Sequence, residues 1–275
     1  MNYTVNGEYV VLSDVTDFSL PATFECGQCF RWNADENGVY HGVAYGRALE
    51  IKSDGDDILL KTTELDFLDV WKDYFDLDTD YTKIRRHVSV NGHMEKAAEF
   101  GAGIRILRQE KWEALCSFII SQCNNIPRIK KIVETLCAMY GGEISDGLYA
   151  FPTAEAIAGL TETDLAPLRA GYRTHYIMEA ARAVVYGIID LNGLAGLPAE
   201  AAIKALQTLP GVGLKVSSCM ALYGLHHLDV FPVDVWMKKA LALHFDCDFD
   251  PKVFSPYAGV AQQYIFNFER NNNGK

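Results

Sequence analysis

The first ninety residues alternate short apolar stretches with glycine-containing turns. In chain order, the stretches and turns are 29–32, Asn37-Gly38, 39–43, Tyr45-Gly46, 48–51, Asp54-Gly55 and 58–60. Asn-Gly and Asp-Gly pairs supply the positive backbone φ that tight hairpin turns need. The pattern predicts an antiparallel meander of four or more strands, followed by a helix over about residues 64–74.

From about residue 91 onward the apolar spacing becomes helical. Trp112, Leu115, Cys116 and Ile119 follow the i, i+3, i+4, i+7 spacing of a helix face. Similar helical segments are predicted at 129–136, 177–184, 201–206 and 216–222. Strands followed by helices indicate an α+β fold. We expect an N-terminal antiparallel β-rich domain over residues 1–92 and an all-α region over residues 93–275.

The composition is that of a globular protein. The chain has 275 residues, of which 49% are hydrophobic and 22% charged, which excludes a disordered tail protein. No run reaches the ~18 apolar residues that cross a bilayer, and the N-terminus does not resemble a secretory signal. The seven cysteines are therefore expected to be free thiols in a reducing cytoplasm.

Charge is unevenly distributed along the chain. The formal net charge is −11, which argues against a general nucleic-acid coat protein. Residues 51–80 carry ten acidic side chains and three lysines, whereas residues 105–131 carry six basic and two acidic side chains. This distribution is compatible with one localised anion-binding face, although such charge runs are also typical of ordinary solvated surface.

The segment Leu209-Pro210-Gly211-Val212-Gly213-Leu214-Lys215 joins two of the predicted helices. Two glycines one residue apart allow a sharp turn and a close approach of backbone N–H groups to a ligand. At a helix N-terminus such groups favour an anion. The segment resembles a helix-hairpin-helix that holds a DNA phosphate without reading the base sequence. An ordinary helix connection with glycine caps explains Gly-Val-Gly equally well.

Lys215 lies in the first turn of the second of these helices. The positive end of the helix and burial both disfavour a cation there, and a neutral amine is a nucleophile that can form a Schiff base. The alternative is a solvated surface lysine. Asp234, in Pro232-Val233-Asp234, precedes another helical run and is explained by an N-cap. The same carboxylate, held rigidly by the cap, is also suited to stabilising positive charge.

The hairpin, the lysine and the aspartate nineteen residues later are together far more specific than each alone. In this combination the sequence resembles the helix-hairpin-helix DNA glycosylase superfamily, and within it the bacterial branch of the 8-oxoguanine DNA glycosylase/AP lyase family. The resemblance extends over about residues 9–268. Supporting stretches are 27–32, 74–78, 117–128, 171–173 and 262–266.

The resemblance implies a base-excision repair enzyme whose helical region has two lobes with the active site between them. Lys215 matches the nucleophile that attacks the sugar C1′ and expels 8-oxoguanine, after which the strand breaks by β-elimination. Asp234 matches the aspartate that stabilises the cationic sugar. The hairpin residues Gly211, Val212 and Gly213 match the phosphate-binding segment.

The flipped base requires a flat apolar slot. Cys219 and Phe266 match its two walls, and Gln262 matches the amide that pairs with the Watson–Crick edge. Gly27 matches the residue whose carbonyl accepts the N7 hydrogen, which 8-oxoguanine has and guanine lacks. Facing guanine, that carbonyl would be left unpaired at a cost of ~1–3 kcal/mol, roughly ten- to hundredfold in discrimination.

A second group of residues matches the part of the family that contacts the orphaned cytosine and fills the gap. Tyr172 matches a wedge, and Arg128 and Arg173 match the pair that donates to cytosine, although their residue types alone favour solvation or a phosphate contact. The family commonly has three asparagines before this helix. Here the sequence is Cys123-Asn124-Asn125, so Cys123 stands where the first asparagine fills the gap.

The expected partner is damaged double-stranded DNA, with no membrane, and the family precedent is a monomer. No cofactor, no catalytic metal and no iron–sulfur cluster are expected, and a structural monovalent or divalent cation at the hairpin is compatible with the family. Cys26 and Cys29 form a C-x-x-C, but a strand pattern follows it, which argues against redox or zinc use. The seven histidines show no H-E-x-x-H.

Three alternatives stay open from the sequence. One is a sibling glycosylase that removes other damaged purines. Another is a non-catalytic helix-hairpin-helix module that only binds DNA. The last is a Schiff-base enzyme that acts on small carbonyl metabolites.

Overall fold

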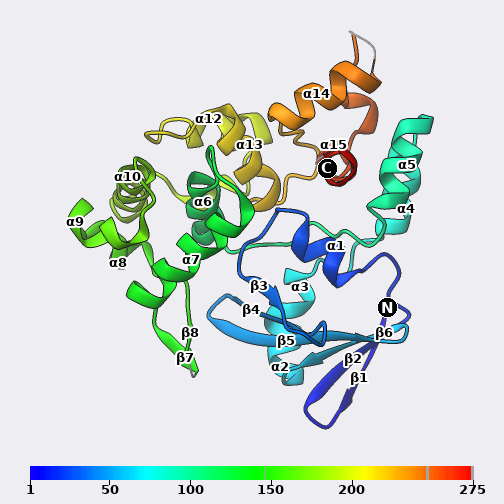
Figure 1. Ribbon diagram of the computed structural model, residues 1–275, viewed down its shortest axis with the longest axis horizontal. Coiled ribbons are helices and arrows are strands. Elements are labelled where there is room, and N and C mark those ends of the chain that lie inside the picture. The colour runs from blue at the N-terminus through cyan, green and yellow to red at the C-terminus, as the bar shows by residue number, and fades with distance from the viewer. Residues whose placement is uncertain (146, 246–247, 274–275) are drawn as a thin grey trace.

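The N-terminal part of the protein is an antiparallel sheet. The computed structural model describes residues 1–145, 147–245 and 248–273. The strands of the main sheet are β1 (Asn2–Asn6), β2 (Tyr9–Ser13), β3 (Trp32–Ala34), β4 (Tyr40–Ala44), β5 (Arg47–Asp54) and β6 (Asp57–Lys61). They pair in the spatial order β1-β2-β6-β5-β4-β3 (Figure 1). A small hairpin, β7 (Glu143–Ser145) with β8 (Leu148–Tyr149), lies apart from this sheet.

One face of the sheet is buried because its residues alternate. Val10 and Leu12 of β2 and Leu60 of β6 are fully buried, while their neighbours along each strand are more exposed. The buried face packs on aromatic rings, among them Phe24 stacked on Trp32 with 4.3 Å between ring centroids. Gly42 faces Trp32 across the β3–β4 pair, where a Cβ would lie 2.3 Å from the indole. A side chain at residue 42 would therefore displace Trp32.

The predicted meander is confirmed, with shifted boundaries and one additional hairpin. The stretches 39–43, 48–51 and 58–60 correspond to β4, β5 and β6. The first predicted stretch, 29–32, overlaps β3 only at Trp32, because β3 runs from Trp32 to Ala34. The hairpin of β1 and β2 was not predicted. Its turn contains Gly7 with a φ of 61°, and β1 is an exposed edge strand that lacks a buried apolar face. Its sequence therefore carries a weak strand pattern.

The predicted helix over residues 64–74 is present but not uniform. It consists of α2 (Glu64–Asp66), a π-helical segment (Phe67–Trp71) and α3 (Lys72–Tyr74). The wider turn buries Phe67, Val70 and Trp71 against the sheet. A short helix that was not predicted, α1 (Leu20–Glu25), begins at the N-cap Ser19 and leads into the Gly27 loop.

The α+β class is confirmed, and the region after residue 92 is mainly helical. It is not all-α as predicted, because the β7–β8 hairpin lies within it. The helices are α4 (Tyr81–Val88), α5 (Gly92–Phe100), α6 (Lys111–Ile120), α7 (Ile126–Tyr140), α8 (Ala154–Ala158), α9 (Glu162–Leu165), α10 (Arg173–Val185), α11 (Leu191–Leu194), α12 (Ala199–Leu206), α13 (Leu214–Tyr223), α14 (Val235–His244) and α15 (Ala258–Asn273), with 3₁₀ turns at Ala166–Leu168 and Pro251–Phe254.

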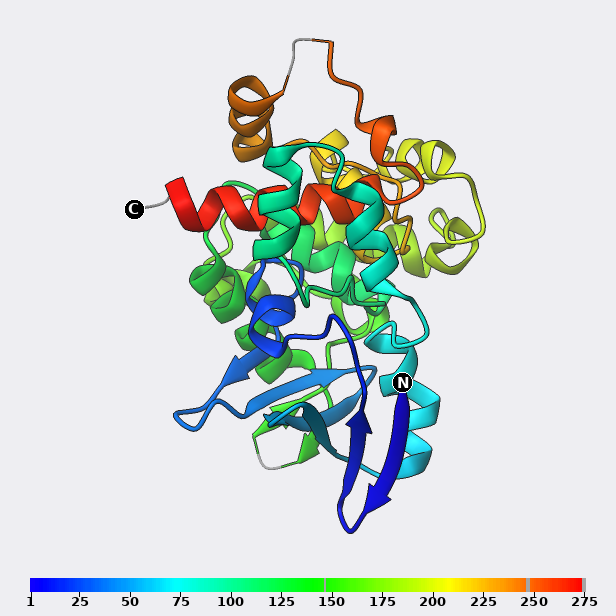
Figure 2. The same ribbon diagram turned by 90° about the vertical axis from the view of Figure 1, so that its right-hand side faces the viewer.

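The helices form two groups above the sheet. In Figure 1, α6 to α10 lie on one side, while α5, α14 and α15 lie on the other, with α12 and α13 between them. Figure 2 shows the last helix, α15, crossing behind α5 and below α14. The boundary at residues 92 and 93 coincides with the start of α5 and stays a prediction. Within the described residues, no helix is both long and apolar enough to cross a bilayer.

Candidate active site

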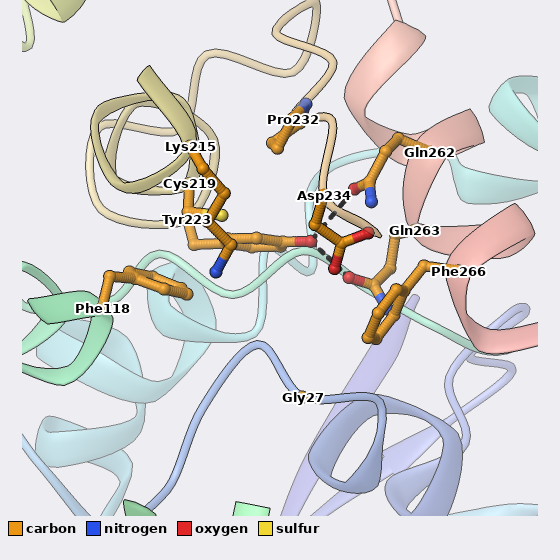
Figure 3. Close-up of a pocket in the computed structure, with 10 residues that line it drawn as sticks. All are labelled: Gly27, Phe118, Lys215, Cys219, Tyr223, Pro232, Asp234, Gln262, Gln263 and Phe266. Carbon is orange, nitrogen blue, oxygen red and sulfur yellow. Dashed lines mark hydrogen bonds between the residues drawn. The ribbon is translucent and has the colours of Figure 1, made fainter. Parts of the chain in front are cut away.

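A pocket lies where α13, α14, α15, α6 and the Gly27 loop meet (Figure 3). It holds about 360 Å³ of empty space, part of which is open to solvent. Ten residues line it: Gly27, Phe118, Lys215, Cys219, Tyr223, Pro232, Asp234, Gln262, Gln263 and Phe266. The pocket thus brings together the six residues predicted for the chemistry and for the base: Gly27, Lys215, Cys219, Asp234, Gln262 and Phe266.

One face of α13 supplies three of the lining side chains. Lys215, Cys219 and Tyr223 are four residues apart and therefore lie above one another along the helix. Lys215 is half-buried in the first turn, and its Nζ lies 5.9 Å from the centre of the Phe118 ring of α6. Phe118 in turn stacks on Tyr223, with 5.4 Å between ring centroids. The amine therefore projects from an apolar wall into the pocket.

Asp234 is fixed by the helix that it begins. Its Oδ1 accepts a hydrogen bond of 2.8 Å from the backbone N–H of Met237, so the predicted N-cap of α14 is confirmed. Figure 3 shows the carboxylate and the Lys215 amine pointing into the same space. Among the described residues, neither group forms an ion pair within 4 Å. The two charges thus share the pocket without being locked to each other.

The thiol of Cys219 contacts the lysine. Burial raises the pKa of the Cys219 thiol, and the charge of Asp234 adds to this effect, while the Lys215 amine opposes it through its charge and a hydrogen bond. The thiol consequently stays protonated at neutral pH. It offers a small, polarisable surface beside the amine rather than a competing thiolate.

The helix α15 supplies the opposite wall of the pocket. Gln262 and Phe266 lie one turn apart on it, and Gln263 lies beside them. The hydroxyl of Tyr223 donates to Oε1 of Gln263 and lies 3.4 Å from Oε1 of Gln262. Both amides are nearly fully buried. Tyr223 therefore sets the orientation of the two amides that face the pocket.

The Gly27 loop closes the pocket from the side of the sheet. The carbonyl of Cys26 accepts a 3.1 Å hydrogen bond from Nε2 of Gln263, and the carbonyl of Gln28 accepts one of 2.8 Å from Nε2 of Gln109. Gly27 itself has a φ of 88°, in the region that favours glycine. Among the described residues, no group donates to its carbonyl. Hydrogen bonds therefore fix the loop at Cys26 and Gln28, on either side of Gly27, and the carbonyl oxygen of Gly27 is left to accept a hydrogen bond from a ligand.

The buried side chain of Gln28 determines the position of this loop. Its Nε2 donates to the carbonyls of Thr23 and Arg105, at 3.0 and 2.7 Å, and its Oε1 accepts from the N–H of Leu107 at 3.0 Å. These bonds join α1 to the irregular segment before α6, so Gln28 links the N-terminal part of the chain to the helical region.

We expect Gln28→Ala to lower the free energy of unfolding by about 3 to 5 kcal/mol, because three buried backbone groups lose partners at about 1–3 kcal/mol each. Urea unfolding measures the change. Gln207→Ala, at an exposed position after α12, is the matched control and should lie within about 0.5 kcal/mol of the unchanged protein. Equal midpoints for both variants would contradict this role of Gln28.

The predicted hairpin connects α12 to α13. Gly211 has a φ of 75°, and a Cβ there would lie 2.2 Å from the ring of Tyr176 on α10, so only glycine fits. Gly213 is the N-cap of α13, is exposed and provides no side-chain acceptor. The first N–H groups of α13 therefore remain available to an anion approaching from outside. The phosphate role of Gly211, Val212 and Gly213 stays a prediction.

The residues predicted to contact the opposite base form a separate cluster outside the pocket. The side chain of Arg173 is buried; it donates to the carbonyl of Gln122, at 2.8 Å from Nε, and to those of Ala170 and Cys123. Its guanidinium lies 4.6 Å from the centre of the Tyr172 ring, which is 51% exposed. Arg173 thus holds the loop in which Cys123 adopts a left-handed φ of 46°.

Other contacts complete this cluster. The Cys123 thiol contacts the Tyr172 hydroxyl, and the pKa of Tyr172 is raised, mainly by desolvation and then by this hydrogen bond. Asn124 donates to the carbonyl of Ile120, and the exposed Arg128 donates to that of Arg169 at 3.0 Å. Tyr172 also meets Tyr176, the ring below Gly211, at 5.7 Å. Tyr172 and the hairpin are therefore connected through Tyr176 of α10.

Four lining residues were missed in the sequence: Phe118, Tyr223, Pro232 and Gln263. Tyr223 had a usable signal, because it continues the four-residue spacing of Lys215 and Cys219. Gln263 and Phe118 had none, because their positions depend on how α15 and α6 pack.

The C-x-x-C does not form a reactive pair. Cys26 and Cys29 are free and buried in different hydrophobic cores, and burial raises the pKa of Cys26 to about 11 and the pKa of Cys29 well above its ordinary value. Neutral thiols are poor nucleophiles and metal ligands. The structure thus agrees with the sequence argument against redox or zinc use.

Comparisons with known proteins match successive parts of the chain to families of base-excision DNA repair proteins. Residues 10–115 match the family described as 8-oxoguanine DNA glycosylase, N-terminal domain, and residues 116–253 match the HhH-GPD superfamily base excision DNA repair protein. The chain is 31% identical over 295 residues to N-glycosylase/DNA lyase OGG1 of Arabidopsis thaliana, covering 91% of this chain and 77% of that protein.

Two solved structures are similar over nearly the full length. One is MBOgg1 in complex with a low affinity DNA ligand, with a TM-score of 0.94, 40% identity and coverage of 100% of this chain and 99% of that chain. Another is the Clostridium acetobutylicum 8-oxoguanine glycosylase/lyase in complex with double-stranded DNA containing cytosine opposite 8-oxoguanine. It has a TM-score of 0.93, 34% identity and 99% coverage of both chains.

Proposed function

The chain belongs to the 8-oxoguanine DNA glycosylase family of the HhH-GPD superfamily, and from this membership we propose that Lys215 and Asp234 perform its chemistry. The protein is a base-excision DNA repair enzyme, a bifunctional N-glycosylase/DNA lyase acting on 8-oxoguanine. The observation that supports the residue assignment is the shared pocket of the amine and the carboxylate, with two buried amides opposite them.

Base excision begins with the amine of Lys215. Its Nζ attacks C1′ of the flipped nucleotide, the bond between C1′ and N9 breaks, and the base leaves with the bonding electron pair and takes up a proton. Opening of the sugar ring and loss of a proton from nitrogen give a Schiff base between Nζ and C1′. The Cys219 thiol and the Phe118 ring lie beside the amine and give it a partly apolar surrounding.

Strand cleavage uses the same covalent link. The Schiff base makes the C2′ protons acidic, so one of them is removed and the C3′–O bond breaks, with the 3′ phosphate as leaving group. Water then hydrolyses the imine and returns the amine of Lys215. A lysine is needed because an activated water would give no imine and hence no lyase step.

Asp234 stabilises the positive charge that develops on the sugar during base departure. Its N-cap hydrogen bond fixes the carboxylate before the substrate binds, so little reorganisation is needed during the reaction. Because Asp234 forms no ion pair within the described residues, its charge is not already neutralised.

The Gly27 loop and α15 read the base. The free carbonyl of Gly27 accepts the N7 hydrogen of 8-oxoguanine, and the Gln262 amide pairs with its Watson–Crick edge. Phe266 and Cys219 provide the two apolar walls. A guanine would place the lone pair of N7 against the Gly27 carbonyl, at a cost of ~1–3 kcal/mol.

The cluster around Tyr172 holds the duplex. Tyr172 is exposed enough to enter the gap left by the flipped nucleotide, with Cys123 and Asn124 beside it. Arg173 contacts the opposite cytosine by exchanging one of its carbonyl bonds, and Arg128 supplies the second guanidinium. The hairpin of Gly211, Val212 and Gly213 binds a phosphate through the N–H groups left free at the start of α13, since the N–H of Val212 already donates to the carbonyl of Leu209 at 3.1 Å.

Enzymes of this type work without a cofactor, and no step above requires one. DNA is the partner of the similar solved complexes. Our proposal extends further to a monomer in the cytoplasm and to a structural cation at the hairpin carbonyls.

A panel of labelled duplexes tests the function. Each duplex carries one lesion opposite one base, and cleavage and borohydride trapping are scored together. We expect 8-oxoguanine opposite cytosine to be cut and the enzyme to be captured covalently. Preferred cutting of alkylated purines would instead identify a sibling glycosylase. Binding without trapping on any duplex would identify a DNA-binding module and overturn the proposal.

A further inference from the structure

Three side chains from three helices meet outside the pocket. They are His93 of α5, His244 at the end of α14 and Glu269 of α15. Their potential ligand atoms all lie within 4.8 Å of one another. In Figures 1 and 2 the three helices lie side by side, with α15 crossing between α5 and α14. None of these residues takes part in the chemistry described above.

The spacing of these atoms is close to that of a metal coordination sphere. Nε2 of His93 lies 3.4 Å from Oε1 of Glu269, and Nε2 of His244 lies 3.3 Å from the same oxygen. In a tetrahedral zinc site with bonds of 2.0–2.1 Å, neighbouring ligand atoms are about 3.3 Å apart. The two distances from the histidine nitrogens to the Glu269 oxygen therefore already match the spacing between ligands of a tetrahedral zinc ion.

The two imidazoles present their Nε2 atoms side by side. Their rings are stacked, with 4.0 Å between centroids and 11° between planes. The edges of His93 pack against Phe245 and Phe268, each at 5.6 Å. This apolar packing holds the His93 ring in place, and a buried Nε2 that makes no hydrogen bond within the described residues is turned toward the carboxylate.

The exposure of the three side chains also suits a metal ion that keeps one coordination position open to solvent. The side chains of His93 and Glu269 are 13% and 5% exposed, so two ligands are held inside the protein. That of His244 is 35% exposed, which leaves room for water as a fourth ligand.

The ligand chemistry selects the ion. Two imidazole nitrogens and one carboxylate oxygen suit zinc and neighbouring transition metals, whereas calcium and magnesium prefer all-oxygen sites. From the convergence of three helices on one point, we propose that His93, His244 and Glu269 bind one zinc ion.

The zinc ion would have a structural role. The helix α14 begins at Asp234, and α15 carries Gln262 and Phe266, so both walls of the pocket continue into the site. A metal that joins their distal ends to α5 fixes the angle between them. The metal would stabilise the packing of these helices without contacting the reacting atoms.

Zinc binding is measured on the purified full chain after chelation and dialysis. Titration against a chromogenic zinc indicator gives the stoichiometry and the dissociation constant. We expect one zinc ion per chain and no comparable binding of Mg²⁺. At a free zinc concentration a hundred times the dissociation constant, Tm should rise by about 5 °C or more, and chelator should reverse the rise.

Single substitutions locate the site. We expect His244→Ala and Glu269→Gln each to weaken zinc binding by more than about 100-fold, since loss of even an outer partner of a ligand costs about 10- to 100-fold. His244 lies at a helix end and is partly exposed, so this variant should fold even if Glu269→Gln does not.

Two controls exclude other sites. His175→Ala removes an exposed histidine that pairs with Glu162 at 3.4 Å but has no third ligand within the described residues. Cys123→Ser removes an exposed thiol. Both should keep the wild-type affinity for zinc. Absence of stoichiometric zinc binding, or equal binding by wild type and His244→Ala, would overturn the proposal and leave the cluster as a histidine–glutamate ion pair.

Discussion

We expect Lys215→Gln to lower the rate of base excision by about 10⁴-fold or more, the scale on which removal of a covalent nucleophile acts. Glutamine keeps the length and the helix position of the side chain but cannot form an imine. Both the glycosylase and the lyase step should therefore fail together. Single-turnover cleavage of a duplex with 8-oxoguanine opposite cytosine measures the rate, and borohydride trapping reports the Schiff base.

The same variant should still bind the damaged duplex, because the hairpin, the wedge and the amides of α15 are unchanged. Lys83→Gln is the matched control, since the side chain of Lys83 is 82% exposed on α4 and does not line the pocket. It should cleave at the wild-type rate. Covalent trapping of the Lys215→Gln variant at the wild-type level would exclude Lys215 as the nucleophile.

Asp234→Asn should give the second large loss, about 10²- to 10³-fold in the rate of base excision, as when one preorganised electrostatic group is removed from an active site. Asparagine caps a helix as well as aspartate does, so α14 should begin at the same residue. The variant thus removes the charge and keeps the hydrogen bond to Met237. Single-turnover assays measure the rate of base excision, and thermal unfolding of the same variant measures its stability.

The control is Asp234→Ala, which removes both the charge and the cap. It should lose a similar factor in rate and, in addition, about 1 kcal/mol of stability, or about 2–4 °C in Tm. If Asp234→Asn cleaved as fast as wild type while Asp234→Ala did not, the carboxylate would act only as a cap.

Part of the proposed catalytic centre could be predicted because Lys215, Cys219 and Asp234 are close in sequence, whereas Gly27, Gln262 and Phe266 were predicted only from the family resemblance. Lys215 and Cys219 share one helix face, and Asp234 follows in a short motif whose N-cap role is itself local. The helical spans around them were predicted from apolar spacing and are confirmed. In contrast, the edge hairpin of β1 and β2 was missed because exposed strands do not alternate strongly.

Contacts between distant segments could not be read from the chain. Gln28 is bound to Arg105 and Leu107, and nothing in the local sequence indicates that an amide is buried there. The cluster of His93, His244 and Glu269 was not predicted either, because its residues are far apart in the sequence. A search for H-E-x-x-H detects ligands on one helix, whereas these three lie on three helices up to 176 residues apart.

The pocket joins the two extremes of the described chain. The backbone of Glu25 and Cys26 accepts hydrogen bonds from Arg270 and Gln263 of the last helix, at 2.6 and 3.1 Å. Lys215 and the hairpin are therefore synthesised before Gln262 and Phe266 of α15. A nascent chain that still lacks α15 lacks one wall of the pocket, so we expect it to have no complete site for a damaged base.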